Sequence, residues 1–428
     1  MSLDGKKIYI HAMVWGGARL MAAAFRACGL DAEVTPPSDA ATLEIGSRYT
    51  GGDECLPARI TVGDYVRVLL ERASEADRIV FFMPGADGPC RFGQYAIHLQ
   101  RLLRQHGFQG TGVLSPSCAD GYRMPAALHR TGWRAVVASD ILLKLLLQHR
   151  PYEIRKGSAD ELYRECVEQV AGAIEGGPLE PGAQMRALRR ALVACRDRFR
   201  ALPVRRDPST PLIGVVGEIF CRLNSFSNAE LIRRIEEYGA EVWLSDVGEW
   251  IWYSHAEQLR LLGLTGRGFS REALAARVRA WIQHRDERRL LEPFARDFAG
   301  YAEPSMREIL AAARPYLPQQ GAIGEMVINV GKAACLARRG VDGIVDISPF
   351  TCMNGVVSEA IYPLLSRDLG GIPIRSFYFD GTQADLDGDL GVFLELVRSY
   401  RARKPVARPW PWGGRRERPQ GRLARAYS

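Results

Sequence analysis

The sequence predicts an α/β protein with two parallel-sheet domains joined by a helical region. Two observations support this prediction. A β-α-β pattern opens the chain and a second one with the same layout begins at residue 212, whereas residues 151–205 between them have a helical character. Because parallel strands need long crossover connections, the alternation of strands and helices predicts a mostly parallel sheet in each half.

The first half, residues 1–150, contains four candidate strands. The opening "KKIYI" predicts a strand, "ARLMAAAFRACG" predicts a helix that ends at Gly29, and "LDAEVTP" predicts the next strand. Two further apolar runs follow, "RIVFFM" at 78–83 and "TGVLSP" at 111–116. We therefore expect an N-terminal α/β domain over residues 1–150.

The helical region at 151–205 holds two segments, "SADELYRECVEQVAGAIEGG" and "GAQMRALRRALVACRDRFRALP", separated by "PLEPG". Residues 206–400 then repeat the layout of the first half. The strand "LIGVVG" leads through a polar loop to a helix with Asn228 as its expected N-cap and Gly239 at its end. The strands "AEVWLS", "DGIVDIS" (342–348) and "IPIRSFYFD" (372–380) complete the predicted C-terminal α/β domain.

The positive charge of the chain is concentrated at its end. The formal net charge is +8, but residues 401–428 hold nine Arg or Lys and one acid, which leaves 48 basic and 48 acidic residues in positions 1–400. A Pro-, Gly- and Arg-rich stretch so poor in apolar residues predicts a basic disordered tail over 401–428. The neutral body argues against a nucleic-acid partner, except through that tail.

No apolar run approaches the roughly 18 residues that span a bilayer, and the start of the chain passes directly into a strand. We therefore expect a cytoplasmic protein without membrane contact. In that compartment the nine cysteines are expected to be free thiols. No Cys-x-x-Cys pair occurs, so any metal ligands must come singly from separate loops.

The cysteines divide into two groups by their place in this pattern. Four lie in helical segments, where a free cysteine is usually a small core residue: Cys28, Cys166, Cys195 and Cys335. Five lie in loops, most of them directly after a predicted strand: Cys55, Cys90, Cys118, Cys221 and Cys352. Ligands gather at the carboxyl ends of parallel strands, so the second group occupies the expected functional edge.

Three of the loop cysteines precede a predicted helix. The segments "IVFFMPGADGPCRFGQY" and "GIVDISPFTCMNGVV" each run from a strand through Pro, Cys and Gly into a helix, and "TGGDECLPARITVGD" places Cys55 in a similar position. A helix N-terminus lowers the pKa of a thiol and favours anions, so thiolates there are able to bind a metal. Spacing alone leaves open the alternative that these cysteines are incidental.

Four segments resemble the family of acyl-CoA dehydratase activase-related proteins: "YTGGDECLPARITVGD", "GPCRFGQY", "GEIFCRLNSFSNAELIRRIEEYGAEVWLS" and "DGIVDISPFTCMNG". This family is related to the iron-sulfur subunits of 2-hydroxyacyl-CoA dehydratases and to double-cubane cluster proteins. The resemblance extends from about residue 8 to about residue 400. It implies Rossmann- or flavodoxin-like domains that hold a 4Fe-4S cluster, or a double-cubane variant, where they meet. Carried over by motif, the implied ligands are Cys55, Cys90 and Cys352.

The resemblance also implies a chemistry and partners. Three thiolates would leave one iron open, and a separate ATP-dependent activator of the actin-like fold would supply a low-potential electron. The implied role is electron transfer, or a reductase-like or 2-hydroxyacyl-CoA dehydratase-like reaction on a CoA thioester or another small molecule. A homodimer or a heterodimer is compatible with this role. The chain itself has no G-x-x-x-x-G-K-[ST] phosphate loop, so ATP binding is assigned to the activator.

Further polar residues are candidates for cofactor binding. Arg91 and Gly93 flank Cys90, while Glu218, Arg222 and Asn224 follow the first strand of the second half. Capping and ion pairing explain the second set equally well. Two alternatives to the iron-sulfur hypothesis stay open: a cluster-free module that closes on a nucleotide- or CoA-type ligand, and an enzyme with Cys90 as its nucleophile.

Overall fold

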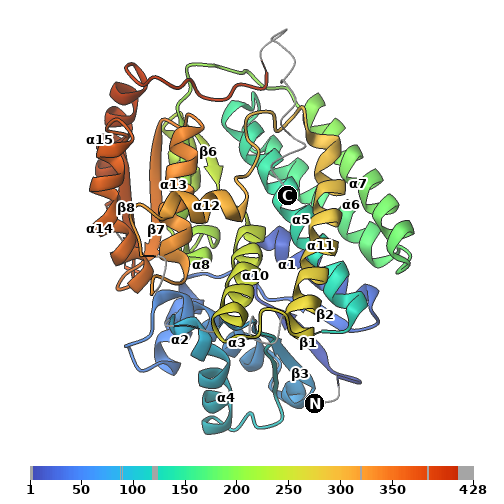
Figure 1. Ribbon diagram of the computed structural model, residues 1–428. Helices are drawn as coiled ribbons and strands as arrows, with labels where there is room; N and C mark the ends of the chain where they lie inside the picture. Colours follow the sequence, from blue (N-terminus) through green and yellow to red (C-terminus); the bar gives the residue numbers. More distant parts are fainter. Residues whose placement is uncertain are drawn as a thin grey trace.

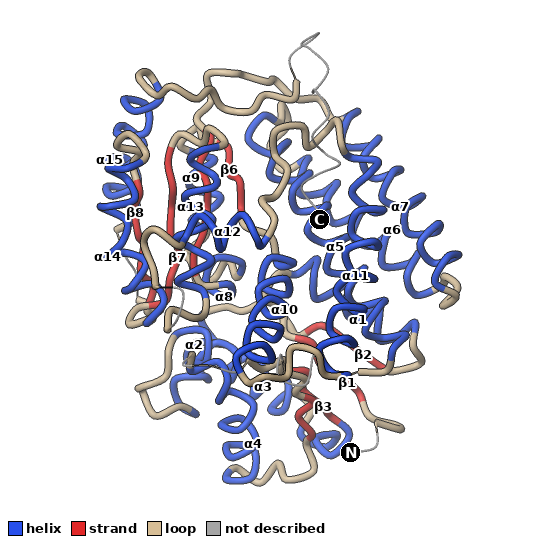
Figure 2. The backbone as a smooth tube through the Cα atoms, viewed as in Figure 1, coloured by secondary structure: helices blue, strands red, loops and turns tan. Residues whose placement is uncertain are grey.

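The computed structural model describes residues 3–86, 88, 90–117, 124–318, 321–382 and 385–412. Two four-stranded sheets form its framework, and within each sheet all the strands are parallel (Figure 1 and Figure 2). The predicted α/β class with two parallel-sheet domains is therefore confirmed. Every strand expected from the sequence is present, close to its predicted limits.

The first sheet has the strand order β2-β1-β3-β4. Its strands are β1 (Lys7–Ile10), β2 (Asp31–Val34), β3 (Ile79–Phe82) and β4 (Gly112–Leu114). Its connections contain α1 (Trp15–Ala27), α2 (Ala40–Tyr49), α3 (Leu56–Glu71), η1 (Ala73–Arg78), η2 (Arg91–Gln94) and α4 (Tyr95–Gln105). Because β1 lies between β2 and β3, the strand order reverses there, and the carboxyl ends of β1 and β3 border the switch point of this sheet.

The second sheet repeats this topology with the order β6-β5-β7-β8. Its strands are β5 (Leu212–Gly217), β6 (Glu241–Leu244), β7 (Gly343–Pro349) and β8 (Ile374–Phe379). The helices around it are α8 (Ile219–Leu223), α9 (Leu231–Glu237), α13 (Glu325–Arg338), α14 (Met353–Asp368) and α15 (Leu386–Arg401). The switch point of this sheet lies at the carboxyl ends of β5 and β7, which correspond to β1 and β3 of the first sheet.

A group of long helices fills the space beside the two sheets. It contains α5 (Ala126–His149), η3 (Arg150–Tyr152), α6 (Ser158–Glu175) and α7 (Pro181–Ala201). The α6 and α7 helices pack on α5, and α6 also packs on α1, as Figure 1 shows at the right of the molecule. Their buried side chains belong to one apolar core that includes residues of both sheets. Residues 151–205, expected to link the domains, thus contribute to the core between them.

The connection between β6 and β7 makes a long helical excursion. It contains α10 (Val247–Leu264), α11 (Arg271–Leu291), η4 (Glu292–Phe294) and α12 (Met306–Ala313). Asp286 of α11 is buried and binds Arg130 and Arg134 of α5 (2.7 and 2.8 Å). This ion-pair cluster fixes the inner face of α11 to the helical group.

The end of the described chain differs from the predicted tail. Arg401 and Lys404 pair with buried Asp342 (2.8 and 2.6 Å), and Arg408 pairs with buried Glu241 (2.6 Å). These bases neutralise buried carboxylates in and beside the second sheet, so Arg401, Lys404 and Arg408 are not part of a solvated basic tail. Residues 413–428 lie outside the described residues.

The Arg408–Glu241 pair gives a test of this docked segment. We expect Arg408→Met to lower the free energy of unfolding by about 3 kcal/mol or more, because Glu241 would remain buried without its counter-charge. Chemical denaturation measures the change.

Exposed Arg403 is the control, and Arg403→Met should change stability by less than about 0.5 kcal/mol. The double variant Arg408→Met/Glu241→Gln should lose less stability than the sum of the single variants. A wild-type unfolding curve for Arg408→Met would show that the segment is not docked.

We expect the stability of the fold to depend on pH because of His149, which lies beneath the same segment. Burial, together with the Arg206 guanidinium, lowers the pKa of His149 to about 3, although its hydrogen bond with the backbone oxygen of Leu145 acts in the opposite sense. In the unfolded chain this pKa is about 6.5. Between these values only the unfolded chain binds the proton, so stability is lost as the pH falls below about 6.5.

We expect His149→Gln to reduce the slope of stability against pH by about 1 kcal/mol per pH unit between pH 6 and 4. Denaturant titrations across that window give the slope. An unaltered slope for His149→Gln would contradict the assignment.

Candidate cysteine site between the two sheets

The three predicted cysteine ligands all occupy helix N-caps. Cys55 is the N-cap of α3, Cys90 is the N-cap of η2, which continues into α4, and Cys352 is the N-cap of α14. The expected position at helix N-termini is therefore observed for each. Cys55 and Cys90 are half-buried and Cys352 is buried.

Cys90 and Cys352 hold equivalent places in the two sheets. Cys90 follows β3 and Cys352 follows β7, the third strand of each half. Both cysteines thus lie next to the switch point of their own sheet, where ligands bind in open α/β folds. Cys55 reaches the same region, because its Sγ lies 2.6 Å from the hydroxyl of Tyr95, the first residue of α4 after the Cys90 turn.

Arg91 connects the three cysteine loops. Its Nη1 donates to the backbone oxygen of Asp53 (2.6 Å), two residues before Cys55, and its Nη2 donates to Oγ1 of Thr351 (3.3 Å), immediately before Cys352. Arg91 itself directly follows Cys90. One guanidinium therefore joins loops from both halves, and its partner Thr351 is 260 residues away in the sequence.

Thr351 has an unusual backbone. Its φ of +63° lies in the left-handed region, which a β-branched residue rarely adopts. Such strain persists only where the surroundings fix it, and it concentrates at functional sites. Here the strained residue holds both the Arg91 contact and the start of the Cys352 turn.

Burial dominates the titration of the three thiols. It raises the pKa of Cys90 to about 12 and also raises the pKa values of Cys55 and Cys352. First-turn backbone N–H groups act in the opposite direction, from Ala58 on Cys55 and from Phe92 on Cys90. In the metal-free protein the thiols therefore keep their protons at neutral pH, and a bound metal must displace them.

Tyr95 is a contact that the sequence analysis missed. Its hydroxyl lies 2.6 Å from Sγ of Cys55, and it comes from the start of α4 in the Cys90 segment. The "GPCRFGQY" motif contains this tyrosine, but only the folded chain brings it to Cys55. It links two of the three cysteine loops directly.

Two carboxyl groups border the cysteines. Glu218, at the end of β5, accepts hydrogen bonds from the backbone N–H groups of Phe220 and Cys221 (3.0 and 2.8 Å) as the N-cap of α8. Glu325 accepts from the N–H of Ile219 (2.8 Å). Burial raises the pKa of both carboxyl groups, and their mutual repulsion further raises that of Glu325. Burial thus opposes the ionisation of both carboxyl groups beside the thiols.

The other predicted cofactor contacts bind the protein itself. Arg222 donates to the backbone oxygens of Gly217 and Asp246 (2.8 and 3.3 Å). The Asn224 side chain accepts from the N–H of Ser227 (2.9 Å) and donates to Ser38 of the first half (3.2 Å). Both residues therefore shape the loop after β5 and its contact with the first half, which agrees with the capping interpretation of this loop.

The other cysteines contribute in different ways. Cys221 is fully buried beside Glu218, with its Sγ directed to the backbone oxygen of Ser227 (3.9 Å). Cys335 is buried in α13 near Arg339 and Glu308. Cys118 lies outside the described residues.

No three His, Cys, Asp or Glu side chains in the described ranges stand close enough to hold a single metal ion. The three cysteines share one region without forming such a compact site. A 4Fe-4S cluster differs in this respect, because its thiolates bind different iron atoms at separate corners. The arrangement of three single cysteines on converging loops is compatible with such a cluster.

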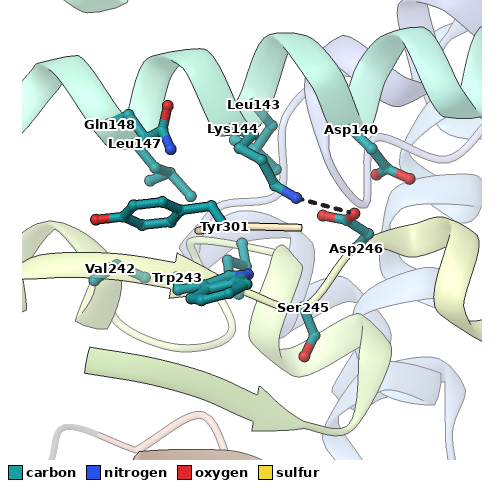
Figure 3. Close-up of a pocket in the computed structure, with 11 residues that line it drawn as sticks. Asp140, Leu143, Lys144, Leu147, Gln148, Val242, Trp243, Ser245, Asp246 and Tyr301 are labelled. Atoms are coloured by element: carbon teal, nitrogen blue, oxygen red, sulfur yellow. Dashed lines mark hydrogen bonds and ion pairs between the residues drawn. The ribbon is translucent and has the colours of Figure 1, made fainter. Parts of the chain in front are cut away.

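A separate cavity lies between α5 and β6. Figure 3 shows Lys144 directed toward Asp246 (3.4 Å) above Trp243 and Tyr301. The volume of this cavity, about 10 Å³, is close to the minimum that holds one water molecule. The cysteines do not line it. It belongs instead to the charged contact between the helical group and the second sheet.

No protein-family model matches the sequence, and no curated protein matches it. In the described part of the chain, no helix is long and apolar enough to cross a membrane.

Gly93 provides a test of the Cys90 turn. A Cβ at this position would lie 2.4 Å from the backbone oxygen of Ala86, which cannot move without displacing the loop. We expect Gly93→Ala to reduce the free energy of unfolding by about 1–3 kcal/mol in chemical denaturation. The matched change Gly391→Ala, in α15 with open space around it, should be neutral or stabilise by up to about 1 kcal/mol. Equal effects of the two substitutions would rule out the close approach.

Proposed function

We propose that this chain is an iron-sulfur protein in which Cys55, Cys90 and Cys352 hold a 4Fe-4S-type cluster between the two sheets. The observation that carries the proposal is the set of Arg91 hydrogen bonds, which joins the three cysteine loops across the two halves. If the three cysteines were incidental, we would not expect one arginine to hydrogen-bond to the loops of the other two. The motif resemblance described above points to the same three positions.

The electrostatic environment supports an anionic group at this place. Three helices begin at the cysteines, and a helix N-terminus favours negative charge. The Arg91 guanidinium adds a positive charge, and the first-turn amides of Ala58, Phe92 and Gly355 oppose the effect of burial on the thiols. A cluster held by thiolates is anionic, and amide hydrogen bonds to its sulfurs tune its reduction potential.

Bound there, the cluster would supply one-electron redox chemistry at low potential. The chain's own residues would hold and shield it: the three thiolates bind it, Arg91 fixes the loops, and Tyr95 orients Cys55. Burial raises the pKa of Glu218 and of Glu325, which reduces the tendency of these carboxyl groups to add negative charge at the site. We assign the protein to electron transfer, or to a reductase-like or dehydratase-like step, with a separate ATP-dependent activator as electron donor.

Anaerobic preparation tests this function. We expect the protein, as isolated or after reconstitution with iron and sulfide, to hold about four irons and four sulfides per chain and to absorb in the visible range. Cys55→Ser, Cys90→Ser and Cys352→Ser should each lower the bound iron severely, because each removes one of three ligands. Iron, acid-labile sulfide and absorbance are measured on every variant.

Cys28→Ser is the control, since Cys28 is half-buried at the end of α1 and should not affect iron content. A protein that stays free of iron after reconstitution would refute the proposal and favour a cluster-free ligand-binding module. If iron binds but survives all three substitutions, the ligand assignment is wrong. Selective alkylation of Cys90 in an iron-free protein would instead favour a cysteine nucleophile.

A further inference from the structure

The outer side of the α10–α11 hairpin carries a concentrated group of exposed apolar side chains, which we call the hairpin patch. Phe269, in the turn between the helices, is fully exposed, and Trp281 is 62% exposed. The patch consists of Leu261 and Leu264 of α10, Phe269, and Leu274, Val278 and Trp281 of α11. A group of exposed apolar side chains that includes Trp and Phe is typical of an interaction site.

The part of the patch on α11 lies on the side of this helix that faces solvent, opposite the side that is buried. Leu274, Val278 and Trp281 follow the spacing i, i+4, i+7, so they form a stripe about 10 Å long on one side of α11. The opposite side contains Ala276, Gln283 and Leu290, which are buried against the rest of the protein. The internal contacts of α11 are thus already made on its other face, and the stripe is not needed to pack it.

The charges around the stripe are of one sign. Arg271, Arg277, Arg285 and Arg288 alternate with the apolar residues along the outer side of α11. The acids of this helix are engaged elsewhere: Glu272 pairs with Arg267, Asp286 is buried with the arginines of α5, and Glu287 accepts from Trp252 (3.3 Å). An occupant that complements this surface must therefore be acidic as well as apolar.

Charge also argues against two occupants from this chain. A second copy would place arginine opposite arginine in a symmetric contact, which repels. The remaining residues 413–428 carry five arginines and one glutamate, and so have the same sign as the patch. An anionic membrane surface would also meet an apolar stripe flanked by arginines, so vesicle binding is measured below as the competing outcome.

We propose that the hairpin patch docks an acidic amphipathic helix of a partner protein. Such a helix would lay leucine-type side chains against Leu274, Val278 and Trp281 and direct its carboxylates to the flanking arginines. Trp281 is the expected anchor, since aromatic residues with neighbouring arginine dominate binding energy at such surfaces, and Arg285 already stacks on its ring (5.6 Å). This proposal is independent of the cluster.

A designed peptide tests the surface directly. The probe is a fluorescent amphipathic peptide of about three heptads with leucine on one face and glutamate on the other, and its lysine counterpart is the charge control. We expect the glutamate peptide to bind and the lysine peptide not to bind, by fluorescence anisotropy. Trp281→Ala should weaken binding at least about 10-fold. Arg277→Glu should weaken it and reduce its dependence on salt.

Leu396→Ala on α15 is the matched control, because Leu396 is also exposed (56%) but lies outside the patch, and its binding should equal that of the wild type. Circular dichroism confirms that the variants fold. Absence of binding by the glutamate peptide, or equal affinity for Trp281→Ala, overturns the proposal. A dimer that Trp281→Ala dissociates in light scattering identifies a second copy instead. Binding to phosphatidylserine vesicles that Trp281→Ala abolishes identifies a membrane surface instead.

Discussion

Parallel strand pairing is the constraint on which the site depends. When all strands of a sheet run the same way, every crossover begins at the same edge, so the loops that follow the strands must lie together. The two sheets repeat one strand order, and this places the turns after β3 and β7 in equivalent positions. The Arg91 hydrogen bonds then connect the two edges, and a site forms from residues that no local motif contains.

Buried charges hold the helical group against the second half of the molecule. Lys332 of α13 donates to Glu249 of α10 (2.7 Å) and also contacts Glu303, which accepts from Lys144 of α5 (2.5 Å). Burial raises the pKa of Glu303, but the two lysines outweigh it and lower that pKa to about 2. The carboxylate is therefore ionised at neutral pH. Removing one member would leave an uncompensated charge inside, so this network ties the helical group, the α10–α12 excursion and the second sheet to one arrangement.

The sequence predicts the strands well because each is a short, fully apolar run between turn signals, as in "RIVFFM" and "LIGVVG". It fails where long-range partners decide the structure. The docked end of the chain is an example. Arg408 is 167 residues from Glu241, and no sequence pattern near either residue predicts that they pair. Composition therefore assigns to a solvated tail a residue that is in fact buried. The Tyr95 contact with Cys55 was missed for the same reason.

The candidate site lies between these two cases. Its cysteines could be placed at helix N-termini from the sequence, because strand, Pro, Cys and Gly follow one another in two segments. Their convergence was an expectation from the family resemblance alone, because it depends on how the two sheets pack and no local pattern encodes that. The structure also reveals opposing effects at the site, with burial raising the thiol pKa values while helix amides lower them. A small anion would gain little there, because the thiols stay protonated. A metal-containing group would be stabilised more. It would replace the thiol protons, and each thiolate could then interact with the helix amides and with Arg91.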